Sequence, residues 1–198
     1  TSRRTDPPPT APFTTVMTWN YFKGPVVWDG REYFQKTTEF DKVRQLPSKT
    51  KASIELAVGS DRYDDNTFRD GGWRYVRGLP VSVTPDGYRD YITCSAGEWS
   101  VAKNVYAAMK TGWFSCRTAC YLAAGRPAVV QDTGWTKTLP SDAGCLAFNT
   151  EDEAAAKLDA VLSDYGRHRE AAYDFAREHL AADRVLPPML EAIGNLAS

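Results

Sequence analysis

The sequence predicts an α/β fold, a Rossmann-like three-layer domain in which helices cover both faces of a parallel sheet of about six strands. Up to Phe148, short apolar runs rich in β-branched residues alternate with segments of helical periodicity. The rest of the chain carries helical periodicity alone. Because strands that alternate with helices are joined by right-handed crossovers, they align in parallel, and a helical carboxyl terminus follows them.

The first half of the sheet is predicted from apolar segments that end at glycine, proline or polar residues. We expect strands at Phe13–Trp19, Ala52–Val58 and Trp73–Val76. Asn20–Arg31 is expected to be a long loop, because glycine and proline interrupt it. Thr37–Leu46 is predicted to be a helix that Pro47 ends, and Asp61–Asp70 is predicted to form a short helix or turns.

The second half of the sheet is predicted in the same way, with strands at Trp99–Ala102, Ala128–Val130 and Cys145–Phe148. Pro85–Thr93 and Ser115–Ala124 are predicted helices, and Gly125 closes the second of them. Beyond the sheet, apolar residues recur at helical spacing through two long segments. Pro187 and Pro188 are expected to interrupt the chain before a last helix that ends near Leu196.

The composition is that of one globular domain. Of 198 residues, 42% are hydrophobic and 25% charged, which is enough for a core without disulfides or metals. Residues 1–12 are proline-rich and predict a linker or tail, and residues 13–198 are predicted to form the domain. A net charge of −1 argues against nucleic acid as a partner, and no apolar run is long enough to span a membrane. The sequence has no apolar leader and begins with Thr1, so we expect a cytoplasmic protein and a piece of a longer chain.

Neither cysteine nor acidic spacing predicts a metal site. The cysteines form no CxxC pair and are expected to be reduced core thiols: Cys94, Cys116, Cys120 and Cys145. One acidic stretch matches no calcium loop, so turn and cap positions are expected for Asp61, Asp64, Asp65 and Asn66. His168 lies in a charged run and is predicted to be solvated, whereas His179 falls on an apolar helical face.

The start of the helix at Ser115 predicts an anion-binding site. The Ser115 hydroxyl is a good N-cap, and the first amides of a helix have no partner inside it. These amides and the helix dipole favour a phosphate group at this point. Arg117 would add bidentate hydrogen bonds to phosphate oxygens, and Gly112 would let the backbone approach a ligand closely. An ordinary capped helix with a solvent-facing arginine is the alternative interpretation.

The run Ala-Ala-Gly-Arg-Pro-Ala-Val-Val-Gln-Asp-Thr-Gly at 123–134 resembles a signature in the carboxyl half of GT-B-fold glycosyltransferases, especially the group 1 enzymes that act on nucleotide sugars. The resemblance covers roughly Thr14 to Leu196, and its specific part is Ser100–Phe148. It implies that this chain binds the nucleotide-sugar donor. It also implies a separate acceptor-binding domain, in cis or in trans, as a partner.

The resemblance places ligand contacts just after the strands and at the start of the Ser115 helix. Arg117 and Lys103 would offset the charge that builds on a leaving diphosphate, without a metal or other cofactor. Donor contacts are expected from Asn20, Asn104, Phe114, Ser115, Thr118, Asp132, Thr133 and Gly134. Glu98 is a weaker candidate for a ligand contact, because it precedes the predicted strand.

Two glutamates that many retaining members carry eight positions apart correspond here to Gly112 and Cys120. This difference favours a second hypothesis, in which the fold is kept as a non-catalytic module that binds a protein or a ligand. An epimerase on the same fold would need further acidic or histidine residues that the sequence lacks. A dinucleotide-dependent dehydrogenase is disfavoured, because no GxGxxG motif follows the first strand.

Overall fold

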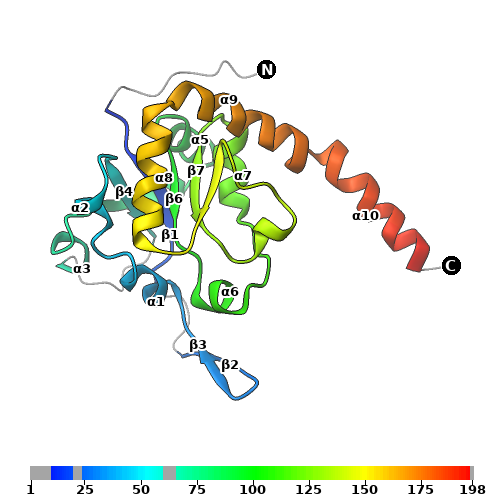
Figure 1. Cartoon of the computed structure of the whole chain (residues 1–198), viewed down its shortest axis with the longest axis horizontal. Coiled ribbons are helices and arrows are strands. Elements are labelled where there is room, and N and C mark those ends of the chain that lie inside the picture. Colours follow the sequence, from blue (N-terminus) through cyan, green and yellow to red (C-terminus); the bar gives the residue numbers. More distant parts are fainter. Residues whose placement is uncertain (1–9, 20–23, 60–65, 197–198) are drawn as a thin grey trace.

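A computed structural model of the chain describes residues 10–19, 24–59 and 66–196 (Figure 1). Its centre is a six-stranded sheet made of β1 (Phe13–Met17), β4 (Ile54–Val58), β5 (Arg74–Arg77), β6 (Gly97–Ser100), β7 (Ala128–Gln131) and β8 (Cys145–Phe148). The strand order is β5-β4-β1-β6-β7-β8, and every neighbouring pair is parallel. This is the doubly wound order of a Rossmann-like sheet, and its direction of winding reverses between β1 and β6. The predicted fold class is therefore confirmed.

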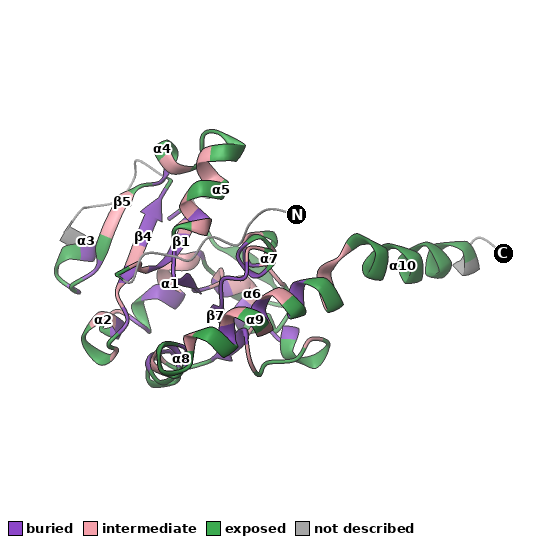
Figure 2. Cartoon of the chain, turned by 90° about the horizontal axis from the view of Figure 1, so that it is seen from above, coloured by how far each residue is buried: buried purple, intermediate pink, exposed green. Residues whose placement is uncertain are grey.

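Helices cover both faces of this sheet. The helical elements in chain order are α1 (Lys36–Asp41), α2 (Leu46–Lys49), α3 (Asn66–Arg69), α4 (Gly78–Ser82), α5 (Pro85–Thr93), α6 (Asn104–Met109), α7 (Cys116–Ala123), η1 (Trp135–Lys137), α8 (Glu151–Ser163), α9 (Tyr165–Phe175), η2 (Ala176–Leu180) and α10 (Ala182–Leu196). Figures 1 and 2 show that α10 runs away from the body of the domain, and its described residues are exposed.

Strand alternation divides the core into two layers. Side chains such as Phe13 and Trp99 point to one face and pack with α1 and α8 in the larger apolar cluster. The opposite face packs against α7 and α9 through a second cluster that includes Leu122 and Val130. Thr14 and Glu98 are the neighbours in sequence of Phe13 and Trp99, so they point toward α7 and place polar groups in that layer.

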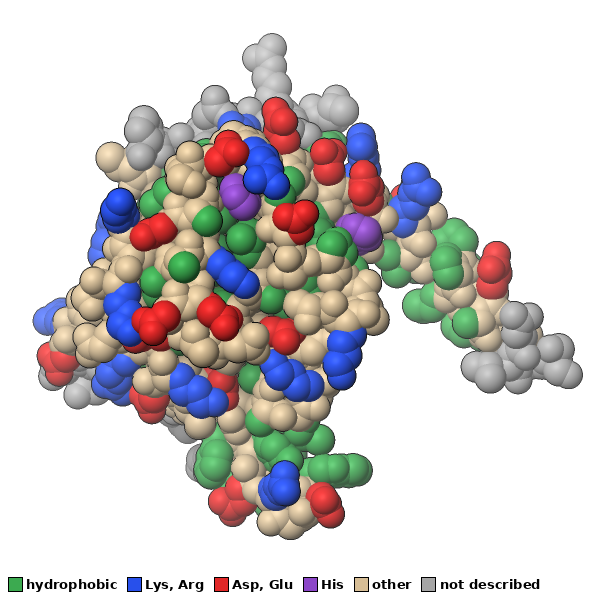
Figure 3. Space-filling view, in the orientation of Figure 1, with side chains coloured by type: hydrophobic (Ala, Val, Ile, Leu, Met, Phe, Trp, Pro, Cys, Tyr) green, Lys and Arg blue, Asp and Glu red, His purple; other side chains and the backbone are tan. Residues whose placement is uncertain are grey.

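A hairpin occupies the segment that was expected to be a loop. β2 (Val26–Trp28) and β3 (Arg31–Tyr33) pair antiparallel, and Asp29 and Gly30 join them with φ of 49° and 69°. Two successive residues with positive φ form a type I′ turn, which suits the twist of a two-stranded hairpin. The expectation of a long loop was wrong, because Asp29-Gly30 is a dipeptide that favours a two-residue hairpin turn. Figure 3 shows hydrophobic side chains gathered on this projecting hairpin.

Proline positions explain two further differences. Pro47 lies in the first turn of α2, so it begins a helix instead of only ending one, because proline fits where no amide donor is needed. Pro187 and Pro188 lie inside α10, which runs through them and contradicts the expected interruption. Two short helices, α4 and α6, were not predicted, and β6 begins two residues before its predicted start at Trp99.

Burial corrects other expectations. His168 is buried and accepts a hydrogen bond at Nδ1 from the Gly144 amide over 3.3 Å, so it is not a solvated residue. Among the cysteines only Cys145 is buried, and the other three are exposed. Pro12 accepts a hydrogen bond from the Ala96 amide, which ties the end of the predicted linker to the domain.

The described residues contain neither a cluster suited to a metal ion nor a helix able to cross a membrane. No group of histidine, cysteine and acidic residues in them has the arrangement to hold a metal ion. None of their helices has the length and apolarity needed to cross a membrane. Asp61, Asp64 and Asp65 lie outside the described residues.

Candidate functional site

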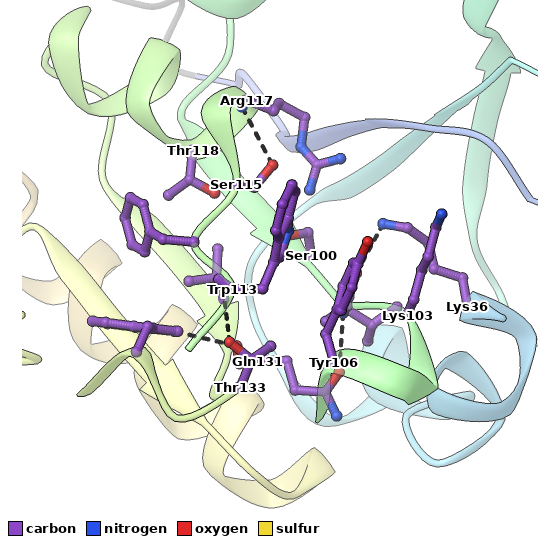
Figure 4. Close-up of a pocket in the computed structure, with 15 residues that line it drawn as sticks. Lys36, Ser100, Lys103, Tyr106, Trp113, Ser115, Arg117, Thr118, Gln131 and Thr133 are labelled. Atoms are coloured by element: carbon purple, nitrogen blue, oxygen red, sulfur yellow. Dashed lines mark hydrogen bonds between the residues drawn. The ribbon is translucent and has the colours of Figure 1, made fainter. Parts of the chain in front are cut away.

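Two adjoining cavities, of about 300 and 410 Å³, open at the carboxyl ends of β1, β6 and β7. This edge lies where the winding of the sheet reverses, the position at which doubly wound domains bind their ligands. The two cavities share the residues Lys36, Lys103, Ser115 and Arg117. Figure 4 shows how side chains from α1, α6, α7 and the strand ends converge on the first cavity.

The start of α7 forms one wall of both cavities. The Ser115 hydroxyl accepts a hydrogen bond from the Arg117 amide over 3.3 Å, as the sequence predicted. Within the described residues, the amides of Cys116 and Thr118 have no hydrogen-bond partner. Unpaired amides at the first turn give the cavity a positive potential and directed donors, so this wall suits an anion.

Arg117 is held in place by a buried carboxylate. Its Nε donates to Oε1 of Glu98 over 2.6 Å, and its Nη1 donates to the carbonyl of Val16 over 2.8 Å. Glu98 is 0% exposed, and its Oε2 has no hydrogen-bond partner within the described residues. The guanidinium therefore stands between β1, β6 and α7 with its Nη2 unpaired with any described residue.

Lys36 supplies a second cation from the opposite side. It begins α1, and its Nζ donates to the carbonyl of Val101 over 2.9 Å. Burial first, and then the positive charges of Arg117 and Lys103, lower the pKa of Lys36 to about 7 against the opposing effect of Glu98. A lysine whose charged form is disfavoured by burial and by neighbouring cations would gain charge if an anion entered the cavity.

Lys103 supplies a third cation and stands over an aromatic stack. Its Nζ lies 5.9 Å from the centroid of the Tyr106 ring. The Tyr106 ring stacks on the Trp113 ring with centroids 4.9 Å apart and an interplanar angle of 18°. All three side chains line the first cavity (Figure 4).

Structural comparison identifies the architecture. The chain superposes on sucrose-phosphate synthase from Thermosynechococcus elongatus with a TM-score of 0.57 and 13% identity, over 96% of this chain and 47% of that one. It superposes on TarM with a TM-score of 0.54 and 10% identity, over 96% of this chain and 37% of that one. Both are GT-B glycosyltransferases.

The chain has the fold of a GT-B carboxyl-terminal domain. No family model matches the sequence, and no curated protein matches it either. The chain spans less than half the length of the two solved structures.

The GT-B-type domain brings together six of the predicted site residues. The first cavity is lined by Lys103, Phe114, Ser115, Arg117, Thr118 and Thr133. Thr133 also donates from its hydroxyl to the carbonyl of Trp113 over 2.6 Å. Asn20 lies outside the described residues, and three other predicted contacts do not line either cavity: Asn104, Asp132 and Gly134.

Asn104 is used inside the GT-B-type domain instead of at the cavity. Its Oδ1 accepts from the Phe34 amide over 2.9 Å, and its Nδ2 donates to Oε1 of Glu39 over 2.7 Å. Burial raises the pKa of Glu39, but hydrogen bonds from Lys42, Asn104 and Gln131 outweigh burial and hold that pKa below its ordinary value. Asn104 therefore secures α1 to α6, and its predicted contact with a donor stays a prediction.

Asp132 and Gly134 shape the turn after β7. Asp132 pairs with Lys110 over 3.1 Å and accepts from the Gly134 amide over 2.8 Å. Gly134 has a φ of 92°, and a Cβ there would lie 2.8 Å from the carbonyl oxygen of Lys110. These residues set the backbone path, and their predicted role as donor contacts stays a prediction.

Sequence reasoning missed Lys36 and undervalued Glu98. Lys36 begins a six-residue helix after an unrecognised hairpin, so nothing in its local pattern marked it as a site residue. Glu98 was placed before the strand, whereas β6 begins at Gly97. Alternation with the buried Trp99 would have pointed Glu98 toward α7 once the strand start was set correctly.

Proposed function

We propose that this chain is the donor-binding half of a glycosyltransferase, and that it binds the diphosphate of a nucleotide sugar at the start of α7. The observation that supports this most is the convergence of Lys36, Lys103 and Arg117 on the unpaired amides of α7. No aspartate or glutamate is among the described residues that line the two cavities. The lining therefore favours an anion, although buried Glu98 offsets part of the charge of Arg117.

The proposed chemistry uses these cations in the transition state. When a glycosyl group leaves a nucleotide sugar, the bond between its anomeric carbon and a phosphate oxygen breaks, and negative charge builds on the diphosphate. Arg117 and Lys103 are the proposed catalytic residues that offset this charge, and Lys36 assists them. No metal ion or other cofactor is part of the proposal.

The acceptor belongs to another part of the enzyme in this proposal. The chain covers 47% and 37% of two solved GT-B glycosyltransferases, so the rest of their length has no counterpart in it. We propose an acceptor-binding domain, in cis or in trans, without which this chain transfers no sugar. A cytoplasmic location is part of the same proposal.

One observation favours a second candidate function. Gly112 and Cys120, which stand where the resemblance implies glutamates, carry no carboxylate, and Arg117 is already paired with Glu98. A non-catalytic module of the same fold, which serves protein or ligand binding, would keep the cavity without needing those carboxylates.

Nucleotide titration tests the proposed site. Uridine, adenosine and guanosine diphosphates are added to the ¹⁵N-labelled protein, and amide shifts are expected at 114–118 and at Lys103. Lys103→Ala should weaken binding, whereas Lys110→Ala should not, because Lys110 pairs with Asp132 away from both cavities. The absence of any shift at millimolar nucleotide would contradict the proposal.

A transfer assay separates the two candidate functions. If the longer protein transfers sugar from a nucleotide donor and Lys103→Ala abolishes transfer, the non-catalytic module is excluded. Nucleotide binding without transfer to any acceptor by the longer protein would favour the module.

A further inference from the structure

The first cavity has an aromatic wall beside its cations. Trp113 is 47% exposed, although it stacks on Tyr106 and lines the cavity. Tryptophans 19, 73, 99 and 135 are buried instead, and they pack in the core clusters. An exposed indole beside cationic side chains offers a flat apolar surface to a ligand that the cations hold by its phosphate.

The backbone around Trp113 is fixed before any ligand arrives. The Thr133 hydroxyl donates to the carbonyl of Trp113 over 2.6 Å. On the preceding residue, the Gly112 amide donates to the carbonyl of Thr133 over 2.8 Å, with a φ of 77° at Gly112. The Tyr106 ring then supports the indole from one side at 4.9 Å. A preset aromatic ring loses little conformational entropy when it binds a ligand.

Proximity to α7 defines what the ring can touch. Only Phe114 separates Trp113 from Ser115, the residue that caps α7, and all three residues line the same cavity. A phosphate at the start of α7 would therefore bring whatever group it carries next to the indole. Inorganic diphosphate carries no such group, whereas a nucleotide carries a planar base and a nucleotide sugar carries a sugar ring as well.

We propose that Trp113, supported by Tyr106, is a specificity-determining residue that stacks on a ring carried by the phosphate ligand. It thereby selects ring-bearing phosphate esters over inorganic phosphates. This inference rests on the proposed function, because it needs a phosphate at the start of α7. It adds the class of ligand that the first cavity prefers, a phosphate ester with a base or a sugar ring.

The test compares three ligands on matched tryptophan variants. Affinities for inorganic pyrophosphate, uridine diphosphate and UDP-glucose are measured by calorimetry on the wild type, Trp113→Ala and Trp28→Ala. Trp28 is the control, because it is 64% exposed on β2 and lines neither cavity. Adenosine and guanosine diphosphates and their glucose conjugates replace the uridine pair if that base does not bind.

The expected result is a selective loss. Trp113→Ala should weaken a ring-bearing ligand by about 5- to 150-fold, the range measured when a stacked base is lost, and leave pyrophosphate binding unchanged. A lower affinity for the nucleoside diphosphate would show that the base stacks on Trp113. A lower affinity for the nucleotide sugar alone would show that the sugar ring stacks on it. Trp113→Phe should restore most of the affinity, and Trp28→Ala should change none of the three affinities.

Other results overturn the inference. An equal effect of Trp113→Ala on pyrophosphate and ring-bearing ligands, or no effect on any of them, would show that Trp113 does not contact a ring. The proposed function survives either result, because the wild type still binds phosphate ligands. If the wild type binds none of the ligands, the proposed function fails together with this inference. Recovery of affinity in Trp113→Phe and an unchanged far-ultraviolet circular dichroism spectrum separate a folding defect from a lost contact.

Discussion

Two sides of the same cavity hold a cation in opposite ways. On the α7 side, Arg117 is paired with buried Glu98 at 2.6 Å and is fixed between β1 and β6. On the α1 side, Lys36 has no carboxylate partner within the described residues and donates to the carbonyl of Val101. The first side carries a permanent charge, whereas the pKa of about 7 leaves the second side only partly charged near neutral pH.

Because of this difference, we expect the Arg117–Glu98 pair to affect mainly the stability of the domain and Lys36 to affect mainly its affinity for a ligand. The Arg117–Glu98 pair belongs to the folded structure, so its loss should be felt as unfolding. The surroundings of Lys36 disfavour its charged form in the free protein. A bound anion would stabilise that charged form, so the charge of Lys36 should contribute to the affinity for the anion. Three predictions test this distinction, beginning with the largest effect.

Glu98→Ala should cost about 3–5 kcal/mol in the free energy of unfolding, because it leaves the buried Arg117 guanidinium without its counter-charge. Urea denaturation followed by circular dichroism measures the effect. Glu98→Gln should cost less, because its amide oxygen can still accept the hydrogen bond from Nε of Arg117.

A double variant is the control for this pair. Glu98→Leu with Arg117→Met removes both charges and keeps apolar volume, so it should be far more stable than Glu98→Ala. It should bind nucleoside diphosphates weakly, because the fixed cation is gone. If Glu98→Ala were as stable as the wild type, Arg117 would not depend on its partner, and the contrast with Lys36 would disappear.

The affinity for a nucleoside diphosphate should fall as pH rises above 7, by up to about tenfold per pH unit. Lys36 loses its proton near pH 7 in the free protein, so a complex that needs the charged ammonium must take up a proton at higher pH. The terminal phosphate of the ligand has a pKa of about 6, so titration between pH 7.5 and 9 isolates the protein group.

Lys36→Met is the control for this pH dependence, and it should bind more weakly with little change in affinity across that range. The same shift affects the domain without ligand. Because unfolded Lys36 keeps its proton up to its usual pKa of 10.5, the contribution of Lys36 to stability should rise with pH from about 7 to about 10.5. A wild-type affinity that stays constant up to pH 9 would contradict the proposed role of Lys36.

Ser115→Ala should produce the smallest effect, about 1 kcal/mol in the free energy of unfolding, because it removes the cap of α7. Thermal unfolding measures it, and Thr84→Ala at the cap of α5 is a matched comparison away from both cavities. Equal losses of unfolding free energy in the two variants, with weaker nucleotide binding only in Ser115→Ala, would support the assignment of the anion site to α7.

The α7 side was predictable from the sequence because its signals are local. Ser115 at the cap and Gly125 after the helix lie within a dozen residues of each other, and the strand that follows has an apolar pattern. The structure confirms helix, cap and strand at those positions. Arg117 on α7 was also predicted to be a site residue, but its partner Glu98 lies on β6, and sequence spacing could not pair the two.

The α1 side was not predictable because it depends on contacts that are distant in sequence. Lys36 reaches the cavity from α1, which Asn104 of α6 holds through its contacts with Phe34 and Glu39. No short-range pattern encodes that packing. The same limit explains His168, whose charged neighbours in the sequence suggested exposure while its ring lies against the Gly144 amide.

The position of β1 in the middle of the sheet has a consequence for synthesis. β1 is the first strand of this sheet to leave the ribosome, its partners β4 and β6 follow much later, and Phe13 pairs in register with Ile54 and Gly97. At roughly 5–20 residues per second, the central strand waits for seconds with its hydrogen-bonding edges unpaired. Such non-local pairing also slows folding, so this domain should fold late in its own translation and depend on protection of β1 until β6 emerges.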